Sequence, residues 1–125
     1  MKKQNVSISI IGLGRIGTAF FDAMRLRQNI NLVCVAELEE TPTKAKAAAA
    51  GIRIVTLDQI VGMGNTIDVI FELTGLPEVR KDLREKLHEA RNYHTIVASE
   101  TIARLIWPLI DDAEPVAVEE RIPGY

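Results

Sequence analysis

The chain has 125 residues, of which 47% are hydrophobic and 26% charged, and its formal net charge is −2. This length suits one domain that buries roughly two-thirds of the surface of its unfolded chain. The weakly negative charge gives no electrostatic reason to expect nucleic acid as a partner, and no apolar run approaches the roughly 18 residues of a membrane span. Because the basic start also lacks the apolar segment of a secretory signal, we expect a cytoplasmic protein.

The first predicted elements are a strand, a glycine-rich turn and a helix. The apolar run at residues 6–11 is typical of a central strand that is covered on both faces of a parallel sheet. It is followed directly by Gly12-Leu13-Gly14-Arg15-Ile16-Gly17, and then by an amphipathic helix pattern that extends to about Arg27. A G-x-G-x-x-G turn between a strand and a helix indicates a dinucleotide-binding site.

Each glycine of this turn has a physical role in such a site. Gly12 permits the tight turn, Gly14 leaves space for a pyrophosphate, and Gly17 lets the helix pack closely on the sheet. The amide groups of the first helical turn, around Arg15 and Ile16, point at the phosphates, and the helix dipole also favours negative charge there. The turn therefore predicts an anion site that is built from backbone.

An acidic residue follows the second strand pattern, at residues 32–36. Glu37 comes twenty residues after Gly17, which is the spacing of a carboxylate that accepts the ribose hydroxyls of adenosine. A carboxylate there repels a 2′-phosphate, so the sequence favours NAD or NADH over NADP. Lys44 and Lys46 are close enough in the sequence to weaken that repulsion, and the alternative is that Glu37 only ends the strand in solvent.

The remaining segments continue the alternation of strands and helices. Thr41 and Pro42 predict the start of a helix that runs through residues 44–50. Further helices are expected at residues 57–61, at residues 77–91 and from about residue 100. Pro108 is expected to kink or end the last of these helices. Strands are expected at residues 52–55, at an edge, and at 67–73 and 95–98. Right-handed crossovers then predict an α/β fold, a doubly wound parallel sheet with strand order 3-2-1-4-5.

In such a sheet, ligands bind over the carboxyl ends of the first and fourth strands. We therefore add Thr74 and Gly75, which follow the fourth strand, to the predicted cofactor site. The single domain is expected to cover residues 1–110 and to bind the dinucleotide, while residues 111–125 form a tail or the start of a linker.

We predict no catalytic group and no metal site. Cys34 lies inside an apolar strand, His88 on a charged helix, and His94 and Asp68 at strand starts away from the cofactor end. Glu72 is a single carboxylate without an evident partner, which is weak support for acid–base chemistry.

With these residues placed, the chain resembles the NAD(P)-binding Rossmann domain of the glucose–fructose oxidoreductase and inositol dehydrogenase family, and more loosely that of homoserine dehydrogenase. The resemblance covers about residues 5–107. It rests on IGLGRIG, on VCVAE ending at Glu37, on IDVIFELTGLPE, and on the VASE segment that ends at Glu100. It implies a nicotinamide dinucleotide, NAD(P), as the cofactor, and Glu37 narrows this expectation to NAD or NADH.

The chain also departs from that family. The family has a Glu-Lys-Pro motif whose lysine helps catalysis. The corresponding residues of this chain are Glu100, Thr101 and Ile102, so the lysine that the resemblance implies is missing. The family's second domain, which supplies the substrate pocket, has no counterpart in these residues. This combination favours an NAD(H)-binding module without catalysis of its own, in a sensory, regulatory or accessory role.

Two other functions stay open at this point. The chain could be the cofactor domain of an NAD-dependent oxidoreductase whose substrate domain is on another chain or was removed, or a non-binding Rossmann domain that only mediates assembly. We also expect a homodimer through the last helix or the tail, because that helix is more apolar than one sheet contact explains. The apolar residues are Ile102, Leu105, Ile106, Trp107, Leu109 and Ile110.

Overall fold

A computed structural model describes residues 5–110, with all their side chains except those of Leu109 and Ile110. Five parallel strands form one sheet in the predicted order, β3-β2-β1-β4-β5. The strands are β1 (Val6–Ile11), β2 (Ile30–Ala36), β3 (Arg53–Ile54), β4 (Val69–Glu72) and β5 (Ile96–Ala98). The predicted tail at residues 111–125 lies outside the described residues, so the boundary at residue 110 stays a prediction.

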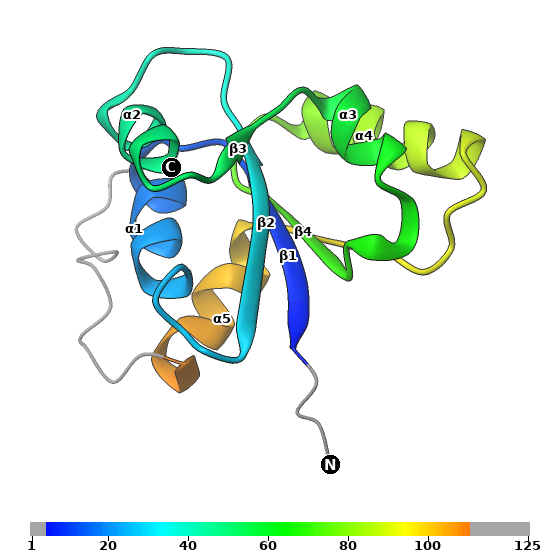
Figure 1. The fold of residues 1–125 in the computed structure, drawn as a ribbon. Helices are drawn as coiled ribbons and strands as arrows, with labels where there is room; N and C mark the ends of the chain where they lie inside the picture. Colours follow the sequence, from blue (N-terminus) through cyan, green and yellow to red (C-terminus); the bar gives the residue numbers. More distant parts are fainter. Residues whose placement is uncertain (1–4, 111–125) are drawn as a thin grey trace.

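Helices cover both faces of the sheet, as a doubly wound fold requires (Figure 1). One face carries α1 (Arg15–Met24), α2 (Pro42–Ala49) and α5 (Glu100–Ile110), and the other carries α3 (Leu57–Gly62) and α4 (Pro77–Glu89). A short 3-10 turn, η1 (Gly64–Thr66), precedes β4. None of the helices within residues 5–110 has the length and apolar character needed to cross a membrane.

The core lies on both sides of β1, whose four last residues are buried. On the side of α1 and α5, Phe20 packs against Phe71 and Trp107, with ring centroids 4.5 and 6.1 Å apart. Trp107, one of the apolar residues of the last helix, is only 6% exposed and belongs to this core. On the opposite side, Cys34 is fully buried, and this burial raises the pKa of its thiol to about 11. Cys34 is therefore a small core residue, as predicted.

The predicted ends of several elements need small corrections. The Thr41 cap is confirmed, because its hydroxyl accepts the Lys44 N–H at 3.0 Å. In contrast, α1 ends at Met24, three residues before the predicted end, and Arg27 instead closes a turn by donating to the Met24 carbonyl at 3.1 Å. Pro108 lies inside the last turn of α5, which ends at Ile110. A proline there removes only one helical hydrogen bond close to the end, so the last turn still forms.

The close packing of α1 on the sheet depends on Gly17. A Cβ at this position would lie 1.8 Å from the carbonyl oxygen of Gly12 and 4.0 Å from the Cβ of Leu73. Real atoms cannot approach so closely, so any side chain at residue 17 would push α1 away from the turn. This is the packing role that the glycine pattern predicts.

We predict that Gly17→Ala lowers the free energy of unfolding by about 2–4 kcal/mol, because the backbone of the turn must move to admit the methyl group. The measurement is urea unfolding followed by circular dichroism. Gly62→Ala is the matched control: a Cβ there meets nothing within 4 Å. It should leave stability unchanged or raise it by up to about 1 kcal/mol, because alanine is the better helix former. Equal stability of Gly17→Ala and the wild type would contradict this account of the turn.

Candidate functional site

The turn between β1 and α1 offers unpaired backbone amides at the carboxyl edge of the sheet. Gly14 is the N-cap of α1 and has no side chain to accept a hydrogen bond from the first helical turn. The first intrahelical bond runs from the Thr18 N–H to the Gly14 carbonyl at 2.8 Å, so the amides of Arg15 and Ile16 have no acceptor within the helix. The first turn also holds no acidic residue. These amides are thus available to an anion.

The space in front of these amides is open. A Cβ at Gly14 would meet no atom within 4 Å, and Gly14 and Arg15 are both exposed. The side chain of Ile16 is buried, at 7% exposure, so this residue presents its backbone and not its side chain. The space that a side chain at residue 14 would enter is therefore free of protein atoms.

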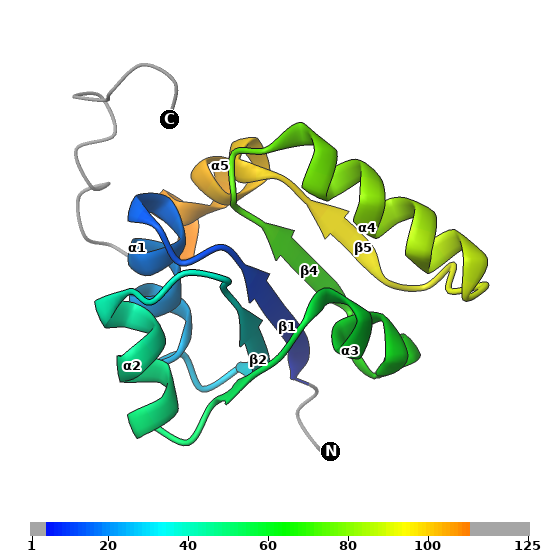
Figure 2. The same cartoon turned by 90° about the horizontal axis from the view of Figure 1, so that it is seen from above.

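The turn after β4 lies against the glycine turn, as Figure 2 shows from above the sheet. Gly12 has φ +97°, and a Cβ on it would lie 2.9 Å from the amide nitrogen of Thr74. Gly75, with φ +76°, is exposed beside it. The structure therefore brings Thr74 and Gly75 next to the glycine turn, although these residues follow a different strand.

Glu37 is held against the same turn. Its Oε1 accepts the Leu13 N–H at 2.6 Å, and its Oε2 accepts the Glu39 N–H at 3.0 Å. Each carboxylate oxygen has two acceptor positions, so Glu37 keeps capacity for further donors such as hydroxyl groups. The carboxylate is half-buried and oriented by backbone amides, and it does not simply end the strand in solvent.

The two lysines that weakened the sequence argument are both paired with carboxylates. Lys44 Nζ lies 3.0 Å from Glu40 Oε2, and Lys46 Nζ lies 2.8 Å from Asp22 Oδ1 on α1. Their charges are offset where they stand, which leaves Glu37 as the charged group that contacts the glycine turn.

Glu72 has partners that the sequence did not reveal. It is fully buried at the end of β4, where its Oε2 accepts the hydroxyl and, at 3.1 Å, the amide of Thr74. Its Oε1 accepts a hydrogen bond from Arg80 Nη1 at 3.3 Å. The description of Glu72 as a carboxylate without a partner is therefore corrected. The partner is one turn into α4, a position that periodicity alone does not mark.

A second carboxylate, Glu100, lies near Glu72 and was also missed. It is the first residue of α5, and a Cβ on Gly75 would lie 3.4 Å from its Oε2. Burial and then the charge of Glu72 raise the pKa of Glu100, while Arg104 and Arg80 act to lower it. The rule that selected Thr74 would have found it, because Glu100 follows the carboxyl end of β5 in the same way.

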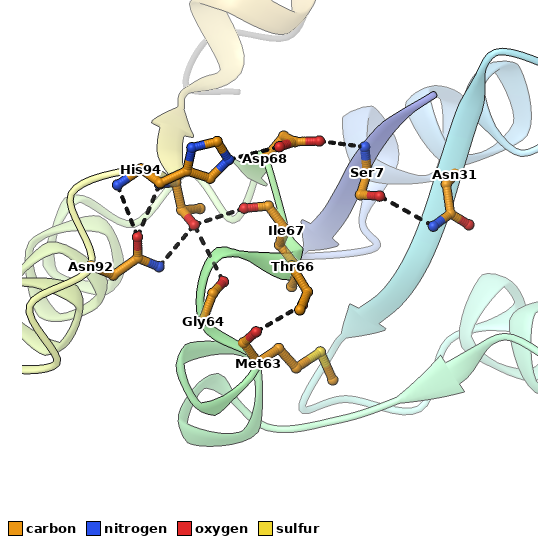
Figure 3. Close-up of polar contacts among 10 residues, drawn as sticks. Ser7, Asn31, Met63, Gly64, Thr66, Ile67, Asp68, Asn92 and His94 are labelled. Carbon is orange, nitrogen blue, oxygen red and sulfur yellow. Dashed lines mark hydrogen bonds and ion pairs between the residues drawn. The ribbon is translucent and has the colours of Figure 1, made fainter. Parts of the chain in front are cut away.

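Asp68 and His94 lie at the opposite edge of the sheet, as predicted (Figure 3). Asp68 Oδ2 accepts the Ser7 N–H at 2.9 Å, and Asp68 Oδ1 is 2.7 Å from His94 Nε2. The hydrogen bond from Ser7, followed by that from His94, lowers the pKa of Asp68. Asn31 donates to the Ser7 hydroxyl at 3.2 Å. These contacts join the amino ends of the strands and do not face the glycine turn. Within the described part of the chain, no three His, Cys, Asp or Glu side chains form a group that could hold a metal ion.

Solved structures of dehydrogenases share this fold. A putative myo-inositol dehydrogenase from Sinorhizobium meliloti 1021 matches 76% of this chain with a TM-score of 0.60 and 26% identity. Apo scyllo-inositol dehydrogenase from Lactobacillus casei matches 79% with a TM-score of 0.58 and 22% identity. Homoserine dehydrogenase from S. aureus matches 89% with a TM-score of 0.58 and 15% identity.

The present chain spans only 27%, 29% and 30% of the lengths of these three proteins. No protein-family model matches the chain, and no curated protein matches its sequence. The predicted resemblance to inositol dehydrogenases and homoserine dehydrogenase is confirmed as a structural likeness. At these identities it is chiefly the Rossmann fold that is shared.

Proposed function

We propose that this chain is an NAD(H)-binding module without catalytic machinery of its own, in a sensory, regulatory or accessory role. The observation that carries the proposal is the open amide cradle at Gly14, with the Glu37 carboxylate held 2.6 Å from the Leu13 amide beside it. An amide cradle next to an oriented acceptor suits a ligand with a pyrophosphate and a ribose. The likeness to dehydrogenase structures supports this ligand class.

In the proposed complex, the chain's own residues bind by backbone and by one carboxylate. The amides of Arg15 and Ile16 donate to the pyrophosphate at the positive end of α1. The remaining acceptor positions of Glu37 receive the ribose hydroxyls of adenosine, and its charge disfavours the 2′-phosphate of NADP. Thr74 and Gly75 border the other half of the dinucleotide.

A second candidate function is the cofactor domain of an NAD-dependent oxidoreductase whose substrate domain lies elsewhere. This candidate is favoured by the share of the dehydrogenase structures that the chain matches. The chain corresponds to only 27–30% of the length of three such structures. The sequence after β5 argues against catalysis by this chain alone. Thr101 and Ile102 stand there in place of the lysine and proline of the family that the chain resembles. A coding sequence that continues into an α+β domain would favour the oxidoreductase over the module. For either role we propose a cytoplasmic location.

The test of binding is calorimetric titration with NAD, NADH, NADP and NADPH, for the wild type and for Gly14→Val. We expect NAD-type binding by the wild type and a loss of more than about 100-fold in Gly14→Val, because the branched side chain takes the place of the pyrophosphate. The melting temperature should change little, since a Cβ at residue 14 meets no atom within 4 Å.

Gly62→Val, at the exposed end of α3, is the matched control and should bind like the wild type. Unchanged affinity in Gly14→Val would place the ligand elsewhere on the molecule. Absence of heat with all four dinucleotides would overturn the proposed function and leave the non-binding assembly domain.

Glu37→Ala tests the choice between NAD and NADP. The loss of a charge-assisted hydrogen bond should weaken NAD by roughly 1.5–3 kcal/mol and narrow the gap to NADP. Glu39→Ala is the control, because it keeps the backbone N–H that Glu37 accepts while removing a neighbouring exposed carboxylate. If the NAD:NADP ratio is the same in Glu37→Ala and the wild type, Glu37 does not contact the ribose.

We also propose a homodimer through α5. Its exposed apolar side chains within the described residues are Ile102, at 42%, and Leu105, at 65%. Leu105→Glu should convert a species of twice 13.9 kDa into one of 13.9 kDa in light scattering, because a carboxylate cannot be buried unpaired in an apolar contact. Leu26→Glu, at a residue 73% exposed beyond α1, should stay dimeric. A wild type that is already monomeric would disprove this interface.

A further inference from the structure

The two ends of the candidate site carry different charged groups. A dinucleotide with its pyrophosphate on the glycine turn and its adenosine ribose at Glu37 directs its nicotinamide half over the carboxyl ends of β4 and β5. Thr74 and Gly75 lie there, and Glu100 begins α5 directly beside Gly75. Figure 2 shows the turn after β4 passing next to the start of α5.

The charges of Glu72 on β4, Arg80 on α4 and Arg104 on α5 all act on Glu100. Glu72 is fully buried and is paired with Arg80 at 3.3 Å, but its charge still raises the pKa of Glu100 more than the charge of Arg80 lowers it. Arg104 is exposed to solvent, and among the described residues Glu100 is in no ion pair. Glu72 and the half-buried carboxylate of Glu100 therefore give this end of the site a negative character, which Arg104 and Arg80 offset only in part.

The nicotinamide ring differs in charge between the two redox forms of the cofactor. The ring of NAD⁺ carries a formal positive charge, and the ring of NADH is neutral. A carboxylate close to the ring stabilises only the oxidised form by Coulomb attraction, and partial burial reduces the screening of that attraction. We infer that Glu100 makes this site select NAD⁺ over NADH, an inference that rests on the proposed function.

A purely structural role for Glu100 predicts something different. A carboxylate in the first turn of a helix is favoured by the helix dipole, whatever ligand is present. In that case removal of the charge would change the stability of α5 but would affect NAD⁺ and NADH equally. The ratio of the two affinities separates the two roles, and the affinity for either ligand alone does not.

The decisive experiment is calorimetric titration of the wild type and of Glu100→Gln with NAD⁺ and with NADH at pH 8. The wild type should bind NAD⁺ about tenfold more tightly than NADH, which is the size of one partly screened charge pair near a protein surface. In Glu100→Gln the two affinities should agree within about twofold. Glu89→Gln, an exposed carboxylate at the far end of α4, is the matched control and should keep the wild-type ratio.

A pH series on the wild type provides a second measurement that needs no variant. The raised pKa of Glu100 means that its carboxyl group takes up a proton at a higher pH than an ordinary glutamate does. As the pH falls through that pKa, the charge is lost and the preference for NAD⁺ should decline towards equal affinity. Glu100→Gln should show a constant ratio over the same range.

The failures of the inference and of the proposed function can be told apart. If neither NAD⁺ nor NADH binds the wild type, the proposed function fails and the inference fails with it. If both bind with equal affinity, or if Glu100→Gln keeps the preference, the module still binds the dinucleotide but Glu100 does not select its redox form.

Discussion

The candidate site depends on the contact between two turns at the carboxyl edge of the sheet. Gly12, after β1, approaches the backbone of Thr74, after β4, so closely that a Cβ would lie 2.9 Å from its amide nitrogen. On its other side, the carbonyl of Gly12 leaves no space for a side chain on Gly17. Three backbone segments therefore meet without intervening side chains. This contact fixes where α1 begins and which way its free amides point.

Around this contact, the site alternates between positive and negative character. The amides at the start of α1 form its centre, Glu37 borders it on the side of β2, and Glu100 borders it on the side of β5. This order complements a ligand with a central anion and hydroxyl donors at one end. Glu72, the remaining carboxylate at this edge, accepts hydrogen bonds from Thr74 and Arg80. The polar contacts of Asp68 and His94, at the other edge of the sheet, contribute to the strand arrangement alone.

The structural likeness to dehydrogenases explains the scaffold and leaves the role of the chain to its own residues. Rossmann folds serve many functions, and the chemistry is set by the groups placed at the switch point of the sheet. Here those groups are the free amides at the start of α1 and the carboxylates of Glu37 and Glu100. On α5, Trp107 belongs to the core while Leu105 stays exposed.

The sequence by itself determined the strand order, the need for glycine at residues 12 and 17, and the place of Glu37 directly after β2. These features follow from local rules: a period of apolar residues, a turn that only glycine can form, and a fixed spacing from turn to acidic residue. Only the tertiary structure decided that Arg80 reaches Glu72, how closely the Glu100 carboxylate approaches Gly75, and that Trp107 faces inward. The physical reason is that these contacts depend on the rotation of α4 and α5 about their axes when they pack on the sheet. Periodicity shows that a helix has an apolar stripe, but the packed sheet decides which of the remaining side chains meet.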